Sequence, residues 1–169
     1  LINTTGAVSV AFYYMYLTTQ QFKRDPLTRA LNRRYFYLDA DRLMKSKCLT
    51  AVISIDLNDL KRFNDENGHA AGDTALCTIV ACIQNILPRG CHLYRTGGDE
   101  FMILCSRVSK DDVPALIDHI RRELSKTLYC CAIGFATPDA DEDFEHICSI
   151  ADAAMYANKK QLKGEDTIR

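Results

Sequence analysis

The sequence has no tryptophan, only four prolines and eight glycines in 169 residues, and no excess of charge of either sign. Lys and Arg number 21 and Asp and Glu 22, so the formal net charge is −1. A general nucleic-acid binder carries a basic excess, so we expect no nucleic acid as a partner, and phosphate chemistry must depend on a few placed cations. With 25% charged and 47% apolar residues, the composition excludes disorder, collagen and coiled coil. The length suits one domain and a short extra segment.

No C-x-x-C motif occurs among the eight cysteines, and the adjacent Cys130 and Cys131 would point to opposite faces of a strand. Most of the cysteines lie among Val, Ile, Leu and Ala, where Cys acts as a small core residue. We therefore expect buried free thiols in a reducing, cytosolic compartment rather than a disulfide framework or a zinc site.

A long hydrophobic run is also missing. Residues 6–17 are apolar and uncharged, but they are too few to span a bilayer, which needs about 20 residues. Two interpretations of this segment stay open. It could be the last turns of a membrane helix, with Lys23 and Arg24 on the cytoplasmic side, or a soluble signalling helix that packs on a partner. No initiator Met is present, so residues 1–24 are interpreted as a helix and linker that follow an upstream sensor or transmembrane region. The membrane interpretation, which we favour, predicts a cytoplasmic domain of a protein anchored in the inner membrane.

From residue 25 onward, helical and strand patterns alternate. Apolar spacing and breaker residues predict helices over 25–46, 59–67, 70–87, 113–124 and 144–160, and strands over 49–55, 91–95, 101–105 and 128–136. Gly97 and Gly98 would form the turn of a hairpin between the second and third strands. This order favours an α/β sandwich with helices covering a central sheet.

Asp56 comes directly after the predicted strand 49–55. A carboxylate at the carboxyl end of a buried strand lies where α/β proteins usually bind ligands. The alternative is an ordinary turn with a capping side chain.

Two further places concentrate polar residues and glycines. Gly97 and Gly98 let a ligand approach the backbone, and the acids Asp99 and Glu100 that follow would repel each other unless a cation lies nearby. The alternative is a plain turn whose acids face solvent. His69 lies in a second glycine-containing stretch, where it could serve a ligand or simply cap or pack.

Together these segments form a specific pattern. It consists of D-P-L-T from Asp25, L-N-R-R from Leu31, D-L-N-D-L-K-x-x-N-D-x-x-G-H-x-x-G-D from Asp56, G-G-D-E-F from Gly97, and A-D-x-A-M-Y from Ala151 with Lys159. The pattern resembles the GGDEF family of diguanylate cyclases over about residues 25–163. The resemblance implies a fold like the nucleotide cyclases and the polymerase palm, a ferredoxin-like α/β sandwich with a mainly antiparallel sheet flanked by helices. Residues 25–169 would form the catalytic domain.

The resemblance also implies an enzyme activity. The family condenses two GTP molecules to cyclic di-GMP with release of two pyrophosphates, and a homodimer brings the two GTP molecules together. Mg²⁺ or Mn²⁺ would be held by Asp56, the Leu57 carbonyl and Asp99, since hard cations take oxygen ligands. Asp99 or Glu100 would also assist deprotonation of the attacking hydroxyl.

The resemblance further assigns the phosphate and signature residues. The phosphates would be bound by Lys159 and Lys163, the Lys61 ammonium, and the backbone amides of Asp59 and Leu60. The signature loop consists of Gly97, Gly98 and Phe101 with the two acids.

Asn64 and Asp73 match the guanine-reading positions, and His69 lies beside them in the pattern. Guanine offers a donor pair that a carboxylate accepts, and adenine lacks it, so Asp73 should select GTP against ATP.

Several positions depart from the family pattern. Asn58 replaces a frequent Asp, Asn158 a common Ala, Leu162 the usual Gly, and Lys163 the usual Arg. The family's feedback site for product is an Arg-x-x-Asp that begins nine residues before the signature. Here the sequence reads Pro88-Arg89-Gly90-Cys91, so this product-inhibition site is absent.

Two other functions compete with the enzyme. A catalytically silent GTP-binding regulatory domain would typically lack the signature acids, whereas Asp99 and Glu100 are both present. A cyclic di-GMP receptor would need the missing Arg-x-x-Asp.

Overall fold

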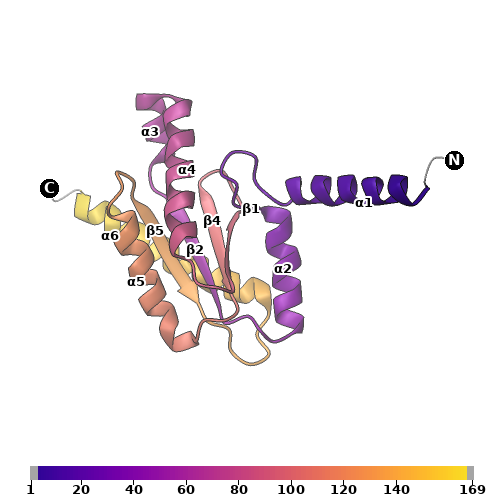
Figure 1. Cartoon of the computed structure of the whole chain (residues 1–169). Helices are drawn as coiled ribbons and strands as arrows, with labels where there is room; N and C mark the ends of the chain where they lie inside the picture. The colour runs from indigo at the N-terminus through magenta and orange to yellow at the C-terminus, as the bar shows by residue number, and fades with distance from the viewer. Residues whose placement is uncertain (1–3, 167–169) are drawn as a thin grey trace.

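One mixed sheet organises the structure, a computed structural model that describes residues 4–166 (Figure 1). In chain order the elements are α1 Thr4–Gln21, β1 Leu31–Asn32, α2 Arg33–Lys45, β2 Ala51–Leu57, α3 Leu60–Asn67, α4 His69–Ile86, β3 Cys91–Arg95, β4 Glu100–Cys105, the 3₁₀ turn η1 Lys110–Asp112, α5 Val113–Leu124, β5 Cys131–Ala136 and α6 Phe144–Asp166.

The five strands lie in the order β1-β3-β4-β2-β5. Strand β2 is antiparallel to both β4 and β5, β3 is antiparallel to β4, and β1 runs parallel to β3. The predicted hairpin around Gly97 and Gly98 is therefore confirmed, as is the mainly antiparallel sheet flanked by helices. The register places Asp56 directly opposite Glu100.

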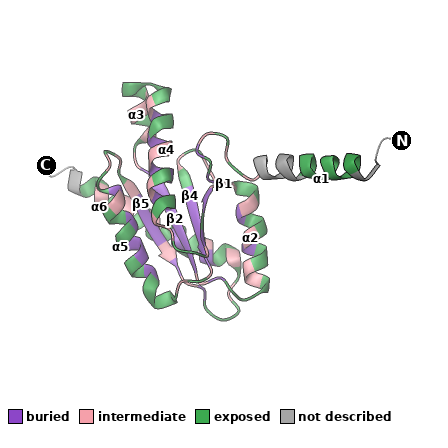
Figure 2. Cartoon of the chain, viewed as in Figure 1, coloured by how far each residue is buried: buried purple, intermediate pink, exposed green. Residues whose placement is uncertain are grey.

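Each face of the sheet carries its own hydrophobic core, and the central strands are buried on both (Figure 2). Helices α4 and α5 pack on one face, where Ile53 and Ile55 belong to the larger cluster. Helices α2 and α6 pack on the other, around Val52 and Tyr94. All seven residues of β2 are buried, so its end is a rigid support for polar groups.

Helix α1 projects away from the sheet and its covering helices (Figure 1). Between residues 6 and 15 its large apolar side chains are exposed, among them Val10 and Phe12. No helix among residues 4–166 is both long and apolar enough to cross a bilayer, and the membrane attachment stays a prediction.

The helix expected to begin at Asp25 begins only at Arg33, so this prediction is wrong at its start. Asp25 instead closes a turn, because its carboxylate accepts hydrogen bonds from both the backbone N–H and the hydroxyl of Thr28 at 2.8 Å. Arg29 has a φ of 64°, which no α-helix allows. The following β1 is only two residues long, and its pairing with β3 is a tertiary contact without a local signal.

Other helix and strand boundaries differ from the predicted ones by a few residues. Strand β2 continues to Leu57, so Asp56 lies inside the strand rather than after it. Strand β5 begins at Cys131 rather than 128, and Leu128 is 98% exposed in the preceding loop. Helix α6 runs beyond the expected residue 160 to Asp166.

All eight cysteines lie within the described residues and are free. Cys91 and Cys105 are buried, as expected of core thiols, but Cys48 and Cys130 are exposed. The expectation of free thiols is therefore met, while burial holds for only some of them.

Candidate functional site

A hollow of about 400 Å³ lies between helix α3, helix α4 and the turn before β4, and it is called the α3–α4 hollow. Its lining residues are Leu60, Lys61, Asn64, Asp65, His69, Asp73, Leu76, Arg95, Gly98 and Asp99. The structure thus brings Asn64 and Asp73, predicted to read guanine, next to Lys61 and the signature turn. His69, the first residue of α4, lies on the same wall.

The Asn64 amide packs against the backbone of Gly72. A Cβ atom on residue 72 would lie 1.8 Å from Asn64 Oδ1, so only glycine leaves room for this side chain. Asn64 Oδ1 is buried and has no hydrogen-bond partner among the described residues. Because buried acceptors are nearly always paired, this amide has unused hydrogen-bonding capacity beside the hollow.

Asp56 and Lys159 form a partly buried ion pair between β2 and α6. Lys159 Nζ donates to Asp56 Oδ1 at 2.5 Å, and the Asp56 side chain is only 10% exposed. A buried carboxylate is costly unless a cation or hydrogen bonds compensate it, and Lys159 supplies the cation. The two positions therefore meet across 103 residues of sequence.

Close packing of α6 on β5 sets the position of Lys159. A Cβ atom on Gly134 would lie 2.0 Å from the Met155 backbone nitrogen, so the helix approaches the strand closely. Asn158 Oδ1 accepts the Ile133 N–H at 3.0 Å, which satisfies a donor on the outer edge of the sheet. Asn158, which departs from the family pattern, therefore makes a structural contact beside Lys159.

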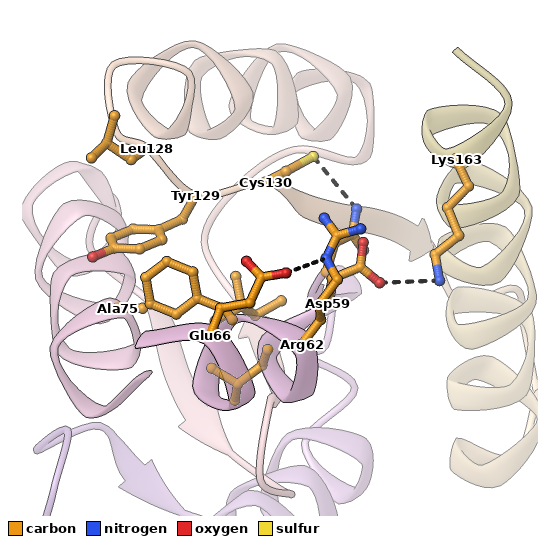
Figure 3. Close-up of a pocket in the computed structure, with 12 residues that line it drawn as sticks. Asp59, Arg62, Glu66, Ala75, Leu128, Tyr129, Cys130 and Lys163 are labelled. Atoms are coloured by element: carbon orange, nitrogen blue, oxygen red, sulfur yellow. Dashed lines mark hydrogen bonds and ion pairs between the residues drawn. The ribbon is translucent and has the colours of Figure 1, made fainter. Parts of the chain in front are cut away.

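The N-terminal end of α3 faces a second, smaller hollow of about 190 Å³ (Figure 3). Asp59 precedes the helix in the left-handed conformation, with a φ of 55°, and Leu60 begins it. The first N–H groups of a helix have no partner within the helix and attract anions. Lys163 Nζ lies 3.3 Å from Asp59 Oδ1, so the residue replacing the usual Arg reaches this end of α3. Leu60 lines both hollows, which makes them neighbours.

Arg95 holds the signature turn. Its guanidinium donates to the Gly97 carbonyl at 3.2 Å, to the Gly98 carbonyl at 2.7 Å and to Asp25 Oδ1 at 2.9 Å. Partial burial opposes ionisation of Asp25, but hydrogen bonds from Thr28 and Arg95 outweigh it and hold the pKa of Asp25 below its ordinary value. The turn after residue 24 and the signature turn are thus tied together by one cation.

The two signature acids lie on different sides of the sheet edge. Asp99 lines the α3–α4 hollow. Glu100 is the cross-strand partner of Asp56 and lines a wide hollow of about 690 Å³ between α2 and α6. A Cβ atom on Gly97 would lie 2.5 Å from Glu100 Oε2, so this glycine leaves room for the carboxylate. Phe101, the last signature residue, is fully buried and anchors β4 in the core.

No three Asp, Glu, His or Cys side chains in residues 4–166 form a ready metal cluster. The donor chemistry nevertheless fits Mg²⁺ or Mn²⁺, because carboxylate and carbonyl oxygens are the ligands these cations prefer. The Leu57 N–H donates to the Asp99 carbonyl at 3.0 Å, which keeps Asp99 beside the end of β2. The Lys159 ammonium at Asp56 shows that a cation is accommodated there.

This arrangement of residues is that of a known protein family. The family model described as "Diguanylate cyclase, GGDEF domain" matches residues 22–165, which include all three hollows described above and the signature turn. The chain belongs to the GGDEF domain family. This GGDEF domain is 28% identical over 145 residues to the diguanylate cyclase DgcM of Escherichia coli K12, an alignment of 80% of this chain and 35% of DgcM. The chain therefore spans about a third of the length of that relative.

Solved structures agree with this GGDEF fold. The coiled coil and GGDEF domain of DgcB from Caulobacter crescentus, in complex with c-di-GMP, superposes with a TM-score of 0.86 at 23% identity, covering 94% of this chain and 92% of that one. The GGDEF domain of PA1120 (TpbB or YfiN) from Pseudomonas aeruginosa is 31% identical, with a TM-score of 0.74 and coverage of 82% and 89%.

Three residues of the GGDEF domain gained a role only from the structure. Gly72 makes room for Asn64, Gly134 admits α6, and Arg95 holds the signature turn. The two acids after Gly98 pointed to a nearby cation, but the sequence did not single out Arg95. Gly72 belongs to the family pattern, but its contact with Asn64, like that of Gly134 with α6, involves another element and has no local signal.

Proposed function

We propose that this GGDEF domain is a diguanylate cyclase that condenses two GTP molecules to cyclic di-GMP and releases two pyrophosphates. The observation that carries the proposal is the α3–α4 hollow, which gathers Asn64, Asp73 and Asp99 beside the Asp56–Lys159 pair. The presence of both signature acids favours turnover over a silent GTP-binding domain.

Guanine binds in the α3–α4 hollow. The Asp73 carboxylate accepts the N1–H and N2–H₂ donors, and the Asn64 amide bonds a remaining polar atom of the base. Gly72 keeps Asn64 in place, since a larger residue would displace the amide. His69 completes the wall near the base.

The triphosphate lies along the N-terminal end of α3. Amides of Asp59 and Leu60 and the Lys61 ammonium bind the β- and γ-phosphates. Lys159 and Lys163 approach from α6, where each is paired with an acid. The positive charges thus come from two elements, α3 and α6, and the β5–α6 packing holds the second of them in place.

Asp56, the Leu57 carbonyl and Asp99 would hold Mg²⁺ or Mn²⁺. When bound, the metal ion neutralises phosphate charge and polarises the α-phosphorus for attack by a ribose 3′-hydroxyl. Asp99 or Glu100 takes up the hydroxyl proton. Glu100 faces away from the guanine-binding hollow, which suits a hydroxyl arriving from GTP held by a second copy.

A homodimer supplies that second copy. The exposed apolar side chains of α1 offer a surface for pairing with another α1. The match to the DgcB structure, which contains a coiled coil, covers 94% of this chain and so extends past residues 22–165 into α1. We propose that α1 brings two domains together and connects them to an upstream sensor or membrane region.

Turnover by the full chain tests the proposal. Purified protein is incubated with GTP and Mg²⁺, with and without a fused parallel dimerisation helix before α1, and the products are separated by chromatography. We expect cyclic di-GMP and pyrophosphate, formed faster by the fused dimer. GTP binding without product from the fused dimer would show a silent domain instead.

Asp73→Ala should raise KM for GTP by about 30- to 150-fold. This corresponds to roughly 2–3 kcal/mol of lost binding free energy, because one carboxylate accepts hydrogen bonds from two donors of the base. The measurement is KM for GTP and for ATP on the same preparations. Asp41→Ala, which removes an exposed acid from α2, is the matched control and should behave like the unaltered protein. Equal turnover of ATP and GTP by the unaltered protein would overturn the base assignment.

Lys159→Met should increase the affinity of nucleotide-free protein for Mn²⁺ by roughly tenfold, because it removes the cation that occupies Asp56. The same change should weaken GTP binding, because a phosphate cation is lost. Mn²⁺ titration by electron paramagnetic resonance and calorimetry with GTP measure the two effects. Lys160→Met is the control, since this lysine lies over the Tyr156 ring instead. Unchanged Mn²⁺ affinity would show that Asp56 is no metal ligand.

Feedback by cyclic di-GMP should be weak and competitive with GTP. The Arg-x-x-Asp clamp would need an acid at residue 91, but Cys91 is 6% exposed and belongs to the core. Arg89 is exposed one position out of register, so Arg89→Ala should not alter inhibition. Steady-state inhibition at several GTP concentrations measures this, and non-competitive inhibition by micromolar product would point to another site.

A further inference from the structure

Two buried thiols face each other across the β3–β4 hairpin, at its end away from the signature turn. Cys91 begins β3, Cys105 ends β4, and the register pairs them directly. Side chains directly opposite in a ladder lie on the same face, and both belong to the core cluster under α4 and α5. The eight cysteines thus include one pair that the sheet itself aligns.

The hydrogen-bond pattern shows which kind of pair this is. Ser106 N donates to Gly90 O at 3.0 Å, one step beyond the two cysteines. Hydrogen-bonded and non-hydrogen-bonded pairs alternate along an antiparallel ladder, so Cys91 and Cys105 form a non-hydrogen-bonded pair. In such pairs the Cα atoms are about 4.5 Å apart, within the range that a disulfide spans.

The two thiols already contact each other. Cys91 is 6% exposed and Cys105 is fully buried. A hydrogen bond from the Cys105 thiol lowers the pKa of Cys91, against the opposing effect of burial, while the same contact and burial raise the pKa of Cys105. Cys91 is therefore the more exposed thiol of the pair, and the contact favours its thiolate.

Cys91 is also the thiol that a reagent can reach. Within β3, strand β1 pairs with Tyr94 and Arg95 at the far end from Cys91. A hollow of about 610 Å³ with Cys91 on its wall opens beside the start of β3. Lys23, Arg24 and Arg42 line this hollow, with Asp39 as its acid. The excess of positive charge favours a thiolate and attracts anionic reagents.

We propose that Cys91 and Cys105 form a dithiol–disulfide site that reacts with small anionic disulfides such as glutathione disulfide. The Cys91 thiolate attacks one sulfur of the reagent, the S–S bond breaks, and one glutathione thiolate leaves and takes up the proton. Cys105 then attacks the Cys91 sulfur of the mixed disulfide and displaces the second glutathione as thiol. Two protein thiols are oxidised and one reagent disulfide is reduced to two thiols. Neither cysteine serves the proposed cyclase reaction, so the site stands independently of it.

Peptide mapping of the full chain tests the proposal. Reduced protein is incubated with glutathione disulfide at neutral pH, quenched with acid, alkylated and digested. We expect a disulfide between Cys91 and Cys105, formed before any other protein disulfide. Cys105→Ser should stop at a glutathione adduct on Cys91, and Cys48→Ser, which removes an exposed thiol, should leave the link unchanged. Adducts confined to exposed cysteines, or a different pair linking first, would overturn the assignment.

Two further measurements do not depend on the variants. Raising the salt concentration from low to physiological should slow the reaction with glutathione disulfide by about threefold, but not the reaction with neutral hydroxyethyl disulfide. The oxidised protein should melt about 5–10 °C higher than the reduced protein, because the link closes a loop in the unfolded chain. Equal salt dependence of both reagents would refute the cationic entry path, and a lower melting temperature would show that the pair cannot form an unstrained disulfide.

Discussion

Asp56→Asn is expected to lower cyclic di-GMP formation by at least about a thousandfold. The Asp56 carboxylate is placed at the end of a fully buried strand, where it would hold the metal ion and balance its charge. An amide keeps the size of the side chain but loses the negative charge, and loss of metal-ion catalysis removes several kcal/mol of transition-state stabilisation. Product formation at saturating GTP and Mg²⁺ measures the effect.

The same variant should remain folded. The introduced amide would still offer Lys159 an acceptor, and the Lys159 side chain is 23% exposed, so its ammonium stays partly hydrated. Thermal unfolding should therefore shift by only a few degrees, and Asp41→Asn on the surface of α2 is the control for loss of one charge. Activity within tenfold of the unaltered protein would show that the metal site lies elsewhere.

Gly134→Ala should cause the largest loss of stability, about 3 kcal/mol or more. The added Cβ would lie 2.0 Å from the Met155 nitrogen and 2.4 Å from the Ala151 oxygen. Both are backbone atoms of α6, so no side-chain rotation relieves the overlap and the helix must move away from β5. Lys159 and Lys163 would move with it, so GTP binding should weaken as well. Denaturant unfolding and calorimetry measure the two effects.

Gly164→Ala is the matched control on the same helix. In the described part of the chain nothing lies within 4 Å of its ideal Cβ, and Ala favours a helix over Gly by up to about 1 kcal/mol. This variant should be as stable as the unaltered protein or slightly more stable. If Gly134→Ala unfolded at the same denaturant concentration as the control, the result would contradict the close packing of α6 on β5.

Local sequence patterns predicted most of the regular elements. The two glycines between apolar strands predicted the hairpin, and helical spacing predicted α4 and α5 to within a residue or two. The failures came where tertiary contacts override local preference. Asp25 and Pro26 look like a helix start, but bonds from Thr28 and Arg95 hold Asp25 in a turn. Strand β1 depends on its pairing with β3, which lies more than 50 residues later in the chain.

By itself the sequence determined the family, because polar residues and glycines at fixed spacing between buried strands form the GGDEF pattern. It also showed the missing Arg-x-x-Asp, since a motif can be read from residue types alone. Only the tertiary structure decided how the site residues meet. Asp99 and Glu100 are neighbours in sequence but face different hollows, and Lys159 reaches Asp56 because α6 packs closely on Gly134. Such contacts join segments far apart in the chain, and packing, not local preference, sets their geometry.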